Sequence, residues 1–405
     1  MSVADAEWFR RPGVQAVFAA LNRKGHEARI VGGAVRNTLL GLPVGDVDFA
    51  ATALPPQIVD FAGKAGLKSV PTGIGHGTIT VVVEGVPYEV TTLRQDVETH
   101  GRHATVAFTR DWAADAARRD FTINALYAAA DGRVVDPLGG LSDLRARRVR
   151  FINSARDRIR EDYLRILRFF RFTAEYGAGP PDPEGLAACI AERAGLARLS
   201  PERIRAETMR ILVSREPLTA IDPMAETGLL GSLLGGVVYV GHFARMATIE
   251  AGVGTQPVPI RRLAALAVRI EEDAARLTAR LRLSNAEATR LTAMTALTPP
   301  IRRDMSESRA KEALYRLGRQ TFQDRLLLAW AITADAKTDE TWRRLYELPE
   351  RWTPPSFVLN GQDLVARGFK PGPELGAALR RLEAKWIASD FRLSRKQLMR
   401  GLGRP

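Results

Sequence analysis

The amino-acid sequence predicts an α+β N-terminal head, built of a mixed sheet with helices, followed by an all-α neck, body and tail. Before residue 150, extended and helical patterns alternate, whereas beyond it almost every segment has the spacing of an amphipathic helix. A chain of 405 residues is also too long for one hydrophobic core. We therefore expect four domains, a head, a neck, a body and a tail, at 1–148, 149–215, 216–300 and 301–405.

The elements expected in the head follow from apolar periodicity and from turn residues. Strands are expected at 28–31, 47–52, 78–83 and 86–94, the last two forming a hairpin around Glu84-Gly85. Helices are expected at 34–40, which Gly41 stops, and at 54–65, which begins with prolines and ends at glycine. Residues 118–140 are expected to form a helix or a strand pair, broken at Asp131-Gly132. Together these elements predict a small sheet with helices packed on it.

Glycine and proline clusters divide the helical part of the chain. The expected breaks are "GAGPPDPEG" at 177–185, "GVGTQPVP" at 252–259, "LTPP" at 297–300 and "RWTPPS" at 351–356. Residues 96–116 are polar and are expected to form a mobile connection within the head. No internal repeat and no low-complexity segment is evident.

Composition excludes several classes of protein. The single cysteine, Cys189, excludes a disulfide framework and a multi-cysteine metal site. There is no GxxxxGK[ST] loop and no His-Asp pair, which argues against P-loop and His-Asp phosphohydrolase chemistry. No apolar run reaches about 18 residues and the N-terminus lacks a signal-peptide core, so we expect a cytoplasmic protein without membrane spans. His76 is expected to anchor a turn instead of acting as a general base.

The net charge of +13 favours a polyanionic partner. Since only 8 of the 59 basic residues are lysines, a GC-rich genome is an alternative source of the arginine excess. Position is more informative than number: residues 145–171 hold ten arginines against three acids. This strip could guide an RNA backbone, and a second basic cluster lies in the tail.

The segment at 31–55 combines features suited to a metal-bound triphosphate. In a strand, Asp46 and Asp48 project to the same side about 6–7 Å apart, a spacing at which two carboxylates can share two Mg²⁺ ions. Gly32 and Gly33 let a phosphate approach the backbone, and Arg36 can direct its guanidinium to the same anion. Each feature alone is common in turns and strand ends, so the prediction depends on their combination.

Glu89 is the candidate for a third carboxylate. It lies mid-strand among apolar residues, where an unpaired acid is costly. A surface-facing strand glutamate is an equally good interpretation of Glu89 taken alone.

Six motifs in order carry a resemblance to a known family. They are "GGAVRNTLLGLPVGDVDFAAT", "YEVTTLR", "RRDFTINALY", "DPLGGLSDL", "REDYLRILRFFRF" and "SPERIRAE". The chain resembles the class II tRNA nucleotidyltransferases, which comprise the CCA-adding enzymes and the bacterial poly(A) polymerases. The match is dense over residues 28–210 and weaker in the tail. Asn37 departs from the aspartate usual in the family, so we assign position 37 no metal role.

The resemblance implies roles for the candidate residues. Asp46 and Asp48 would hold catalytic Mg²⁺, Glu89 would help to activate the primer 3′-hydroxyl, and Gly33 and Arg36 would bind the triphosphate. Arg119 would contact the nucleotide and Asp120 its ribose.

In "REDYLRILRFFRF", Asp162, Arg165 and Arg168 are expected to share one helical face. The resemblance implies that Asp162 and Arg165 read the base of CTP or ATP without a nucleic-acid template, while Arg168 and Arg171 serve the phosphates or stack nearby. An i,i+3 salt bridge between Asp162 and Arg165 on a solvated face is the alternative.

The resemblance therefore predicts an enzyme that adds CCA to the 3′ end of tRNA, with CTP, ATP and Mg²⁺. A poly(A) polymerase or a specialised A-adding or C-adding enzyme is the alternative, and a non-catalytic RNA-binding protein is a more distant one. "SVPTGIGHGTITVVV" replaces the GRRF-like strand usual in poly(A) polymerases, which favours CCA addition. In the family, the segment at 96–116 is a flexible loop that helps the switch from C to A addition, and Arg102 is its candidate residue.

Overall fold

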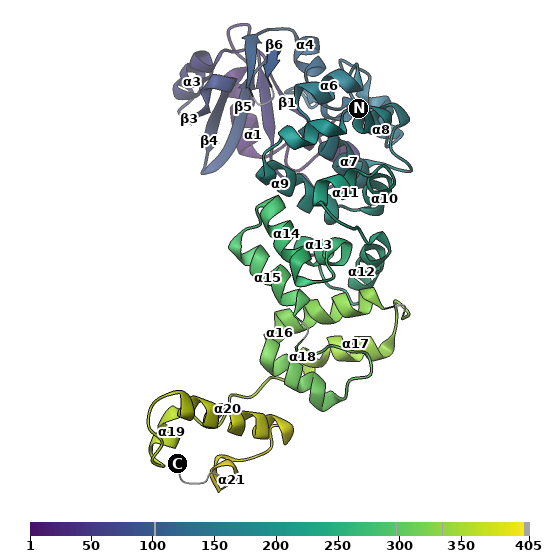
Figure 1. Cartoon of the computed structure of the whole chain (residues 1–405). Coiled ribbons are helices and arrows are strands. Elements are labelled where there is room, and N and C mark those ends of the chain that lie inside the picture. The colour runs from purple at the N-terminus through teal and green to yellow at the C-terminus, as the bar shows by residue number, and fades with distance from the viewer. Residues whose placement is uncertain (101–102, 297, 334, 401–405) are drawn as a thin grey trace. The chain divides into compact units, whose positions relative to one another are not determined.

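A computed structural model describes residues 1–100, 103–296, 298–333 and 335–400. The chain forms two compact units, Met1–Leu233 and Leu234–Pro405. The first holds the sheet and its helices, and the second is helical (Figure 1). The α+β head followed by helices is therefore confirmed, while the division into four domains stays a prediction.

The first unit is built on a seven-stranded mixed sheet of order β3-β4-β5-β2-β1-β8-β9. Its strands are β1 (Ala28–Val31), β2 (Asp48–Ala51), β3 (Lys68–Gly73), β4 (Thr78–Val83), β5 (Val86–Thr92), β8 (Tyr127–Ala128) and β9 (Val134–Val135). Only β2 and β5 pair in parallel, and every other neighbouring pair is antiparallel. Helices α1 (Pro12–Leu21) and α3 (Pro55–Lys64) contact each other and the sheet.

The predicted hairpin is present because its turn suits the residues there. Val83 pairs with Val86, and the two turn residues, Glu84 and Gly85, have positive φ angles of 50° and 81°. Two successive positive φ angles match the right-handed twist of a tight hairpin. The 118–140 segment forms the strand pair β8–β9, joined by a turn at Asp131-Gly132. Helix α2 (Gly33–Leu39) follows the first strand, as expected.

The segment at 96–116, expected to form a polar, mobile connection, has regular secondary structure in the part that is described, and its mobility stays a prediction. Strands β6 (Arg94–His100) and β7 (His103–Phe108) pair as a separate two-stranded sheet, and α4 (Trp112–Ala117) follows. Arg102 lies outside the described residues. His76 ends a 3-10 turn, η1 (Ile74–His76), and its carbonyl accepts a hydrogen bond from Arg94.

Helices complete the first unit and lie to one side of the sheet (Figure 1). They are α5 (Gly140–Arg145), α6 (Ala155–Glu161), α7 (Leu164–Tyr176), α8 (Pro183–Ala191), α9 (Pro201–Leu212), α10 (Leu218–Glu226) and α11 (Leu229–Leu234), with 3-10 turns η2 (Thr122–Asn124) and η3 (Arg193–Arg198). The expected continuous helix through Asp162 is wrong: Asp162 is extended, with φ −153° and ψ 106°. Its carboxylate accepts from the Leu164 N–H at 3.1 Å, which favours an Asx turn over a helical residue.

The second unit is helical throughout its described residues. It comprises α12 (Val240–Gly252), α13 (Pro259–Ala267), α14 (Glu271–Leu281), α15 (Asn285–Thr295), α16 (Glu307–Ile332), α17 (Glu340–Tyr346), α18 (Leu348–Arg351), α19 (Gly361–Val365), α20 (Pro373–Ala388) and α21 (Arg395–Arg400). The predicted breaks fall between helices, and Gly318 kinks α16 with a φ of 73°. Among the described residues, no helix has the length and apolarity needed to cross a membrane.

Candidate active site

A pocket of about 560 Å³ in the first unit collects the predicted site. Eleven of the twelve candidate residues line it: Gly32, Gly33, Arg36, Asp48, Glu89, Arg119, Asp120, Asp162, Arg165, Arg168 and Arg171. Asp46 does not line it. The lining also includes residues that sequence reasoning had not assigned to the site, among them Arg118, Asn124 and Phe172. Because seven arginines line the pocket, Arg94 included, it is strongly cationic and suited to an anionic ligand.

The carboxylates come from two neighbouring parallel strands. Phe49 of β2 pairs with Val90 of β5, and both are buried, so the preceding residues, Asp48 and Glu89, emerge on the exposed side. Asp46 lies in the loop just before β2 and is also exposed, while Val47 between the two aspartates is buried. The alternation expected for Asp46 and Asp48 is therefore present, although only Asp48 lies in the strand.

Electrostatics show that these three acids influence one another. Desolvation raises the pKa of Asp48, and the negative charges of Glu89 and Asp46 raise it further, against a smaller opposite effect of Arg119. Like charges held together in this way are stabilised by a bound cation, so the residues fit a divalent metal ion. Within the described ranges, however, no three His, Cys, Asp or Glu side chains are grouped closely enough to hold one ion. The candidate ligands are thus Asp46 and Asp48, and Glu89 stands beside them as a neighbouring carboxylate.

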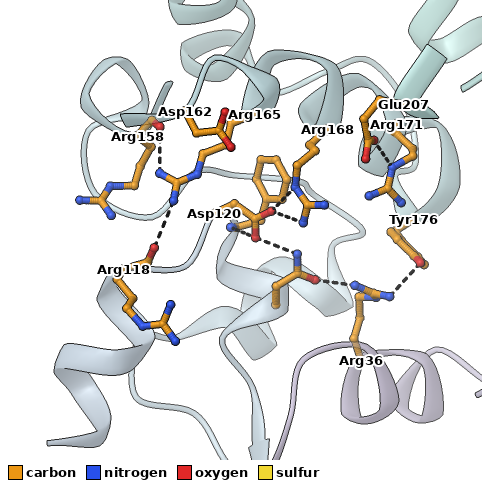
Figure 2. A network of polar contacts seen from close by, with 12 residues as sticks. Arg36, Arg118, Asp120, Arg158, Asp162, Arg165, Arg168, Arg171, Tyr176 and Glu207 are labelled. Atoms are coloured by element: carbon orange, nitrogen blue, oxygen red, sulfur yellow. Dashed lines mark hydrogen bonds and ion pairs between the residues drawn. The ribbon is translucent and has the colours of Figure 1, made fainter. Parts of the chain in front are cut away.

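Arg36 is buried and contacts Tyr176 of helix α7, and Figure 2 shows the contact. Its side chain is 5 % exposed, and its guanidinium stacks on the Tyr176 ring at 3.8 Å. It donates to the Tyr176 hydroxyl at 2.8 Å and to the Asn124 amide oxygen. The sequence analysis expected Arg36 to point at a phosphate, and it did not predict this contact with Tyr176, which joins α2 to α7. No carboxylate pairs with Arg36 in the described chain, so its charge is available to an anion in the pocket.

The backbone at Gly32 is shaped for the turn into α2. Gly32 has a φ of 73°, which disfavours any residue with a side chain, and its N–H donates to the Leu126 carbonyl at 3.0 Å. The Gly32 N–H is therefore engaged within the fold. What the glycine contributes is the absence of a Cβ, which lets a ligand approach the backbone closely.

Asn37 has a structural role that an aspartate could not fill. Its amide oxygen accepts from Arg36, at 2.8 and 3.0 Å, and its amide nitrogen donates to the Pro43 carbonyl at 2.8 Å. A carboxylate lacks the donor for the second contact. Asn37 thereby anchors the loop that leads to Asp46.

Asp120 is occupied by protein groups in the centre of Figure 2. One carboxylate oxygen accepts from Arg168 at 2.5 and 2.8 Å, and the other accepts from the Asn124 amide and the Phe121 N–H, both at 2.9 Å. Burial opposes ionisation of Asp120, but Arg168 and Asn124 outweigh it and hold the pKa below its usual range. Asp120 therefore fixes Arg168 in the pocket wall.

Asp162 and Arg165 are each held by a different partner. The Asp162 carboxylate pairs with Arg203 of α9 at 2.7 Å. The Arg165 guanidinium pairs with Glu161 and donates to the carbonyls of Arg158 at 2.8 Å and Arg118 at 3.3 Å. The shared helical face predicted for Asp162 and Arg165 is wrong, since the chain breaks between α6 and α7, and the alternative of an i,i+3 salt bridge between them is not what the structure has.

Phe172 is the centre of a cationic cluster, and the sequence analysis had given it no role. The guanidinium carbons of Arg171, Arg168 and Arg36 lie 4.5, 5.1 and 5.3 Å from its ring centroid. Arg171 also pairs with the buried Glu207 at 2.6 Å. A face of an aromatic ring attracts cations, so Phe172 helps to hold like charges together.

Arg119 is positioned by a buried acid that sequence reasoning missed. Asp115 is 1 % exposed and accepts from Arg119 at 3.0 Å, from Arg118 at 2.9 Å and from the Tyr127 hydroxyl at 2.8 Å. Burial opposes its ionisation, but Arg119 and Arg118 hold the pKa of Asp115 below its ordinary value. The signal for it was an aspartate near the end of a helix, four residues before Arg119.

We expect Asp115→Asn to lower the free energy of unfolding of the first unit by about 3 kcal/mol at neutral pH, because the half-buried Arg119 loses its buried carboxylate partner. Since the folded pKa lies below the unfolded value of about 3.9, the stabilisation is complete above that value and is lost as the pH falls through the folded pKa. The difference from wild type should thus shrink in acid. Urea denaturation between pH 3 and 7 measures it, and Asp5→Asn, which breaks an exposed pair with Arg10, is the control. Equal effects of the two substitutions would contradict this account.

A mixed sheet that carries paired carboxylates beside an arginine-lined pocket is the architecture of a nucleotidyltransferase. Three family models match the chain: "Poly A polymerase head domain" at residues 28–150, "Probable RNA and SrmB-binding site of polymerase A" at 181–237 and "tRNA nucleotidyltransferase domain 2 putative" at 261–400.

A mouse relative named "CCA tRNA nucleotidyltransferase 1, mitochondrial" is 34 % identical over 400 residues, which cover 96 % of this chain and 89 % of that protein. The crystal structure of the Bacillus stearothermophilus CCA-adding enzyme in complex with CTP has a TM-score of 0.69 and 27 % identity, with 93 % and 92 % of the two chains covered. A Thermotoga maritima CCA-adding enzyme complexed with tRNA shares the fold, with a TM-score of 0.69, 20 % identity and coverage of 95 % and 93 %. The chain belongs to the family of CCA tRNA nucleotidyltransferases, the CCA-adding enzymes.

Proposed function

We propose that this enzyme adds or repairs the 3′-terminal CCA of tRNA, taking CTP and ATP as substrates and using no nucleic-acid template. The observation that carries the proposal is the match over nearly the whole chain to CCA-adding relatives, together with a pocket lined by eleven of the twelve expected residues. This evidence favours CCA addition over poly(A) synthesis.

The proposed roles follow from where the residues lie. Asp46 and Asp48 hold the divalent metal on which nucleotidyltransferases generally depend, and Mg²⁺ is the ion that we propose, since it prefers carboxylate and phosphate oxygens. When bound, it neutralises charge on the triphosphate and on the attacking oxygen. Glu89 lies next to Asp48 and is placed to accept the proton of the primer 3′-hydroxyl.

The arginine wall binds and orients the nucleotide. Arg36, Arg119, Arg168 and Arg171 supply positive charge to the phosphates, and their hydrogen-bond partners within the fold hold them in position. Asp120 acts through Arg168 and Asn124 instead of standing free for the ribose.

Asp162 and Arg165 form the base-reading pair in this proposal. Arg203 and Glu161 hold them, so an acceptor and a donor are presented to the base edge at fixed positions. Fixed hydrogen-bonding groups reject a wrong base by leaving a polar group unpaired.

The test is incubation of the purified protein with tRNA that lacks CCA, with CTP and ATP supplied separately and together. CCA addition predicts two C residues with CTP alone and the full CCA with both, analysed at single-nucleotide resolution. A long A tract with ATP alone would identify a poly(A) polymerase, and addition of only C or only A would identify a specialised enzyme. The compartment that we propose is the cytoplasm, although the mouse relative is named as mitochondrial.

We expect tRNA affinity to fall linearly on a log–log plot against salt, with a slope of about −4 or steeper, because the basic strip at 145–171 and the tail neutralise several phosphates. CTP affinity, which depends on one triphosphate, should change less. Filter binding of tRNA and titration of CTP between 50 and 300 mM KCl compare the two, and a tRNA affinity that does not respond to salt would contradict the electrostatic contribution.

A further inference from the structure

A second cationic pocket lies within the helical unit, apart from the site described above. It measures about 390 Å³ and is lined by the end of α13, by α15 and α16, and by the loop that joins the last two. Three arginines line it, Arg269, Arg302 and Arg325, and none of its lining residues in the described part of the chain is an Asp or Glu. Apolar groups form the rest of the wall, including Met294, Leu328 and Ile332. The pocket is therefore positive with an apolar floor.

Arg325 is a buried charge without a counter-charge. Its side chain is 5 % exposed, and it donates to the carbonyls of Thr298 at 3.3 Å and Pro299 at 2.8 Å. These contacts satisfy hydrogen bonds but leave the positive charge uncompensated, and burial alone lowers the pKa of the guanidinium. Across the described ranges, no carboxylate lies within ion-pair distance of it.

Comparison with the other buried arginines of the described chain shows that a buried guanidinium without a carboxylate partner is unusual. Arg261 and Arg262 of the same unit both pair with Glu250, and Arg261 also pairs with Asp324. Arg36 is the one further buried arginine in the described residues without an ion pair, and it lines the proposed triphosphate pocket. Arg325 thus shares with Arg36 the property expected of a residue whose counter-charge is a ligand.

Arg269 and Arg302 add two exposed charges at the mouth of the pocket. Neither makes an ion pair within the described chain, whereas the next residue, Arg303, pairs with Asp339 at 2.9 Å. Exposed arginines are ordinarily paired or solvated at little cost, so these two alone would not define a site. The guanidinium carbon of Arg269 also lies 5.6 Å from the Tyr239 ring centroid. Together with Arg325, these two residues give the cavity three arginines that have no carboxylate partner in the described chain.

We propose that this pocket binds a backbone phosphate of the tRNA substrate, at a point outside the nucleotide-adding site. The proposal rests on the proposed function, because that supplies the RNA. The cavity of about 390 Å³ is larger than a lone phosphate needs, and its apolar floor suits the ribose and base that adjoin a phosphate in RNA. Arginine forks match phosphate geometry, so three arginines around one cavity suit a phosphate ligand.

The test compares the double variant Arg269→Ala/Arg302→Ala with wild type. Both side chains are exposed, so the variant should fold, and its thermal unfolding checks this. We expect its affinity for tRNA to fall about tenfold, as for loss of a charge-assisted contact, and its log–log salt slope to become shallower by about 1. In CCA addition, KM for tRNA should rise while kcat and CTP affinity stay as in wild type.

Arg303→Ala is the matched control, since it removes the same charge from the adjacent position but from an ion pair. It should leave the salt slope unchanged. A double variant that binds tRNA as wild type does, or a control with the same loss, would overturn the proposal. If either result is found while the wild-type protein adds CCA, only the phosphate pocket is rejected and the proposed function stands. If the wild-type protein adds no CCA, the proposed function itself is rejected.

A second arm uses inorganic phosphate at constant ionic strength to identify the source of the anion. If phosphate raises the Tm of wild type but not of the double variant, and tRNA affinity also falls in the variant, the RNA phosphate is supported. If phosphate raises the Tm of wild type only, but the double variant binds tRNA as tightly as wild type does, the pocket binds a free anion and the tRNA proposal is wrong.

Discussion

Replacement of Asp48 by alanine should reduce nucleotide addition by about a thousandfold or more while tRNA still binds. Asp48, the first residue of β2, is the candidate carboxylate that lines the pocket, and it lies near Glu89 and Asp46. A bound metal contributes several kcal/mol of charge stabilisation in the transition state, and a thousandfold loss corresponds to about 4 kcal/mol. Single-turnover addition of CMP to tRNA measures the rate.

The same substitution has a second, independent readout. Because Asp48 loses its repulsion with two neighbouring acids, the variant should be as stable as wild type or more stable without metal, and should gain less stability from added Mg²⁺. Asp60→Asn, on α3 at the surface, is the control and should retain activity. Rapid turnover by Asp48→Ala in Mg²⁺ would remove Asp48 from the proposed metal site.

Loss of nucleotide discrimination is the expected result of Asp162→Ala. If Asp162 and Arg165 read the base edge, the variant should raise incorporation of UTP or GTP relative to CTP by about one to two orders of magnitude, since one good bidentate contact is worth about 1–3 kcal/mol. Arg165→Ala should impair both CTP and ATP use, because its fork can face either base. Competition among the four nucleoside triphosphates on tRNA that ends before CCA measures the ratio.

Arg203→Ala separates base reading from folding. It leaves Asp162 in place but removes the 2.7 Å partner that orients it, so discrimination should decline partly while CTP binding persists. Glu184→Gln, an exposed acid of α8 outside the pocket, controls for the loss of an acid in this region. Unchanged selectivity in a folded Asp162→Ala protein would mean that the base is read by other residues.

Local sequence determined those features whose cause lies within a few residues. The turn at Glu84-Gly85 fixes the hairpin, because a non-glycine residue followed by glycine can adopt two positive φ angles. Alternation along β2 and β5 places Asp48 and Glu89 on the exposed side, because their apolar neighbours are buried. Glycine and proline clusters end the helices where expected. The motif order was sufficient to identify the family before any contact was known.

Only the tertiary structure decided which partner each charged side chain takes. Arg36 contacts Tyr176, Asp120 contacts Arg168 and Asp162 contacts Arg203, and each pair joins elements that are distant in the sequence. Helical periodicity placed Asp162 and Arg165 on one face because it assumes a continuous helix, but the Asx turn at Asp162 breaks it. Periodicity specifies the direction of a side chain along its own segment. The choice among several nearby arginines and acids is made by burial and distance across segments, since a buried charge beside its counter-charge costs less free energy than one buried alone.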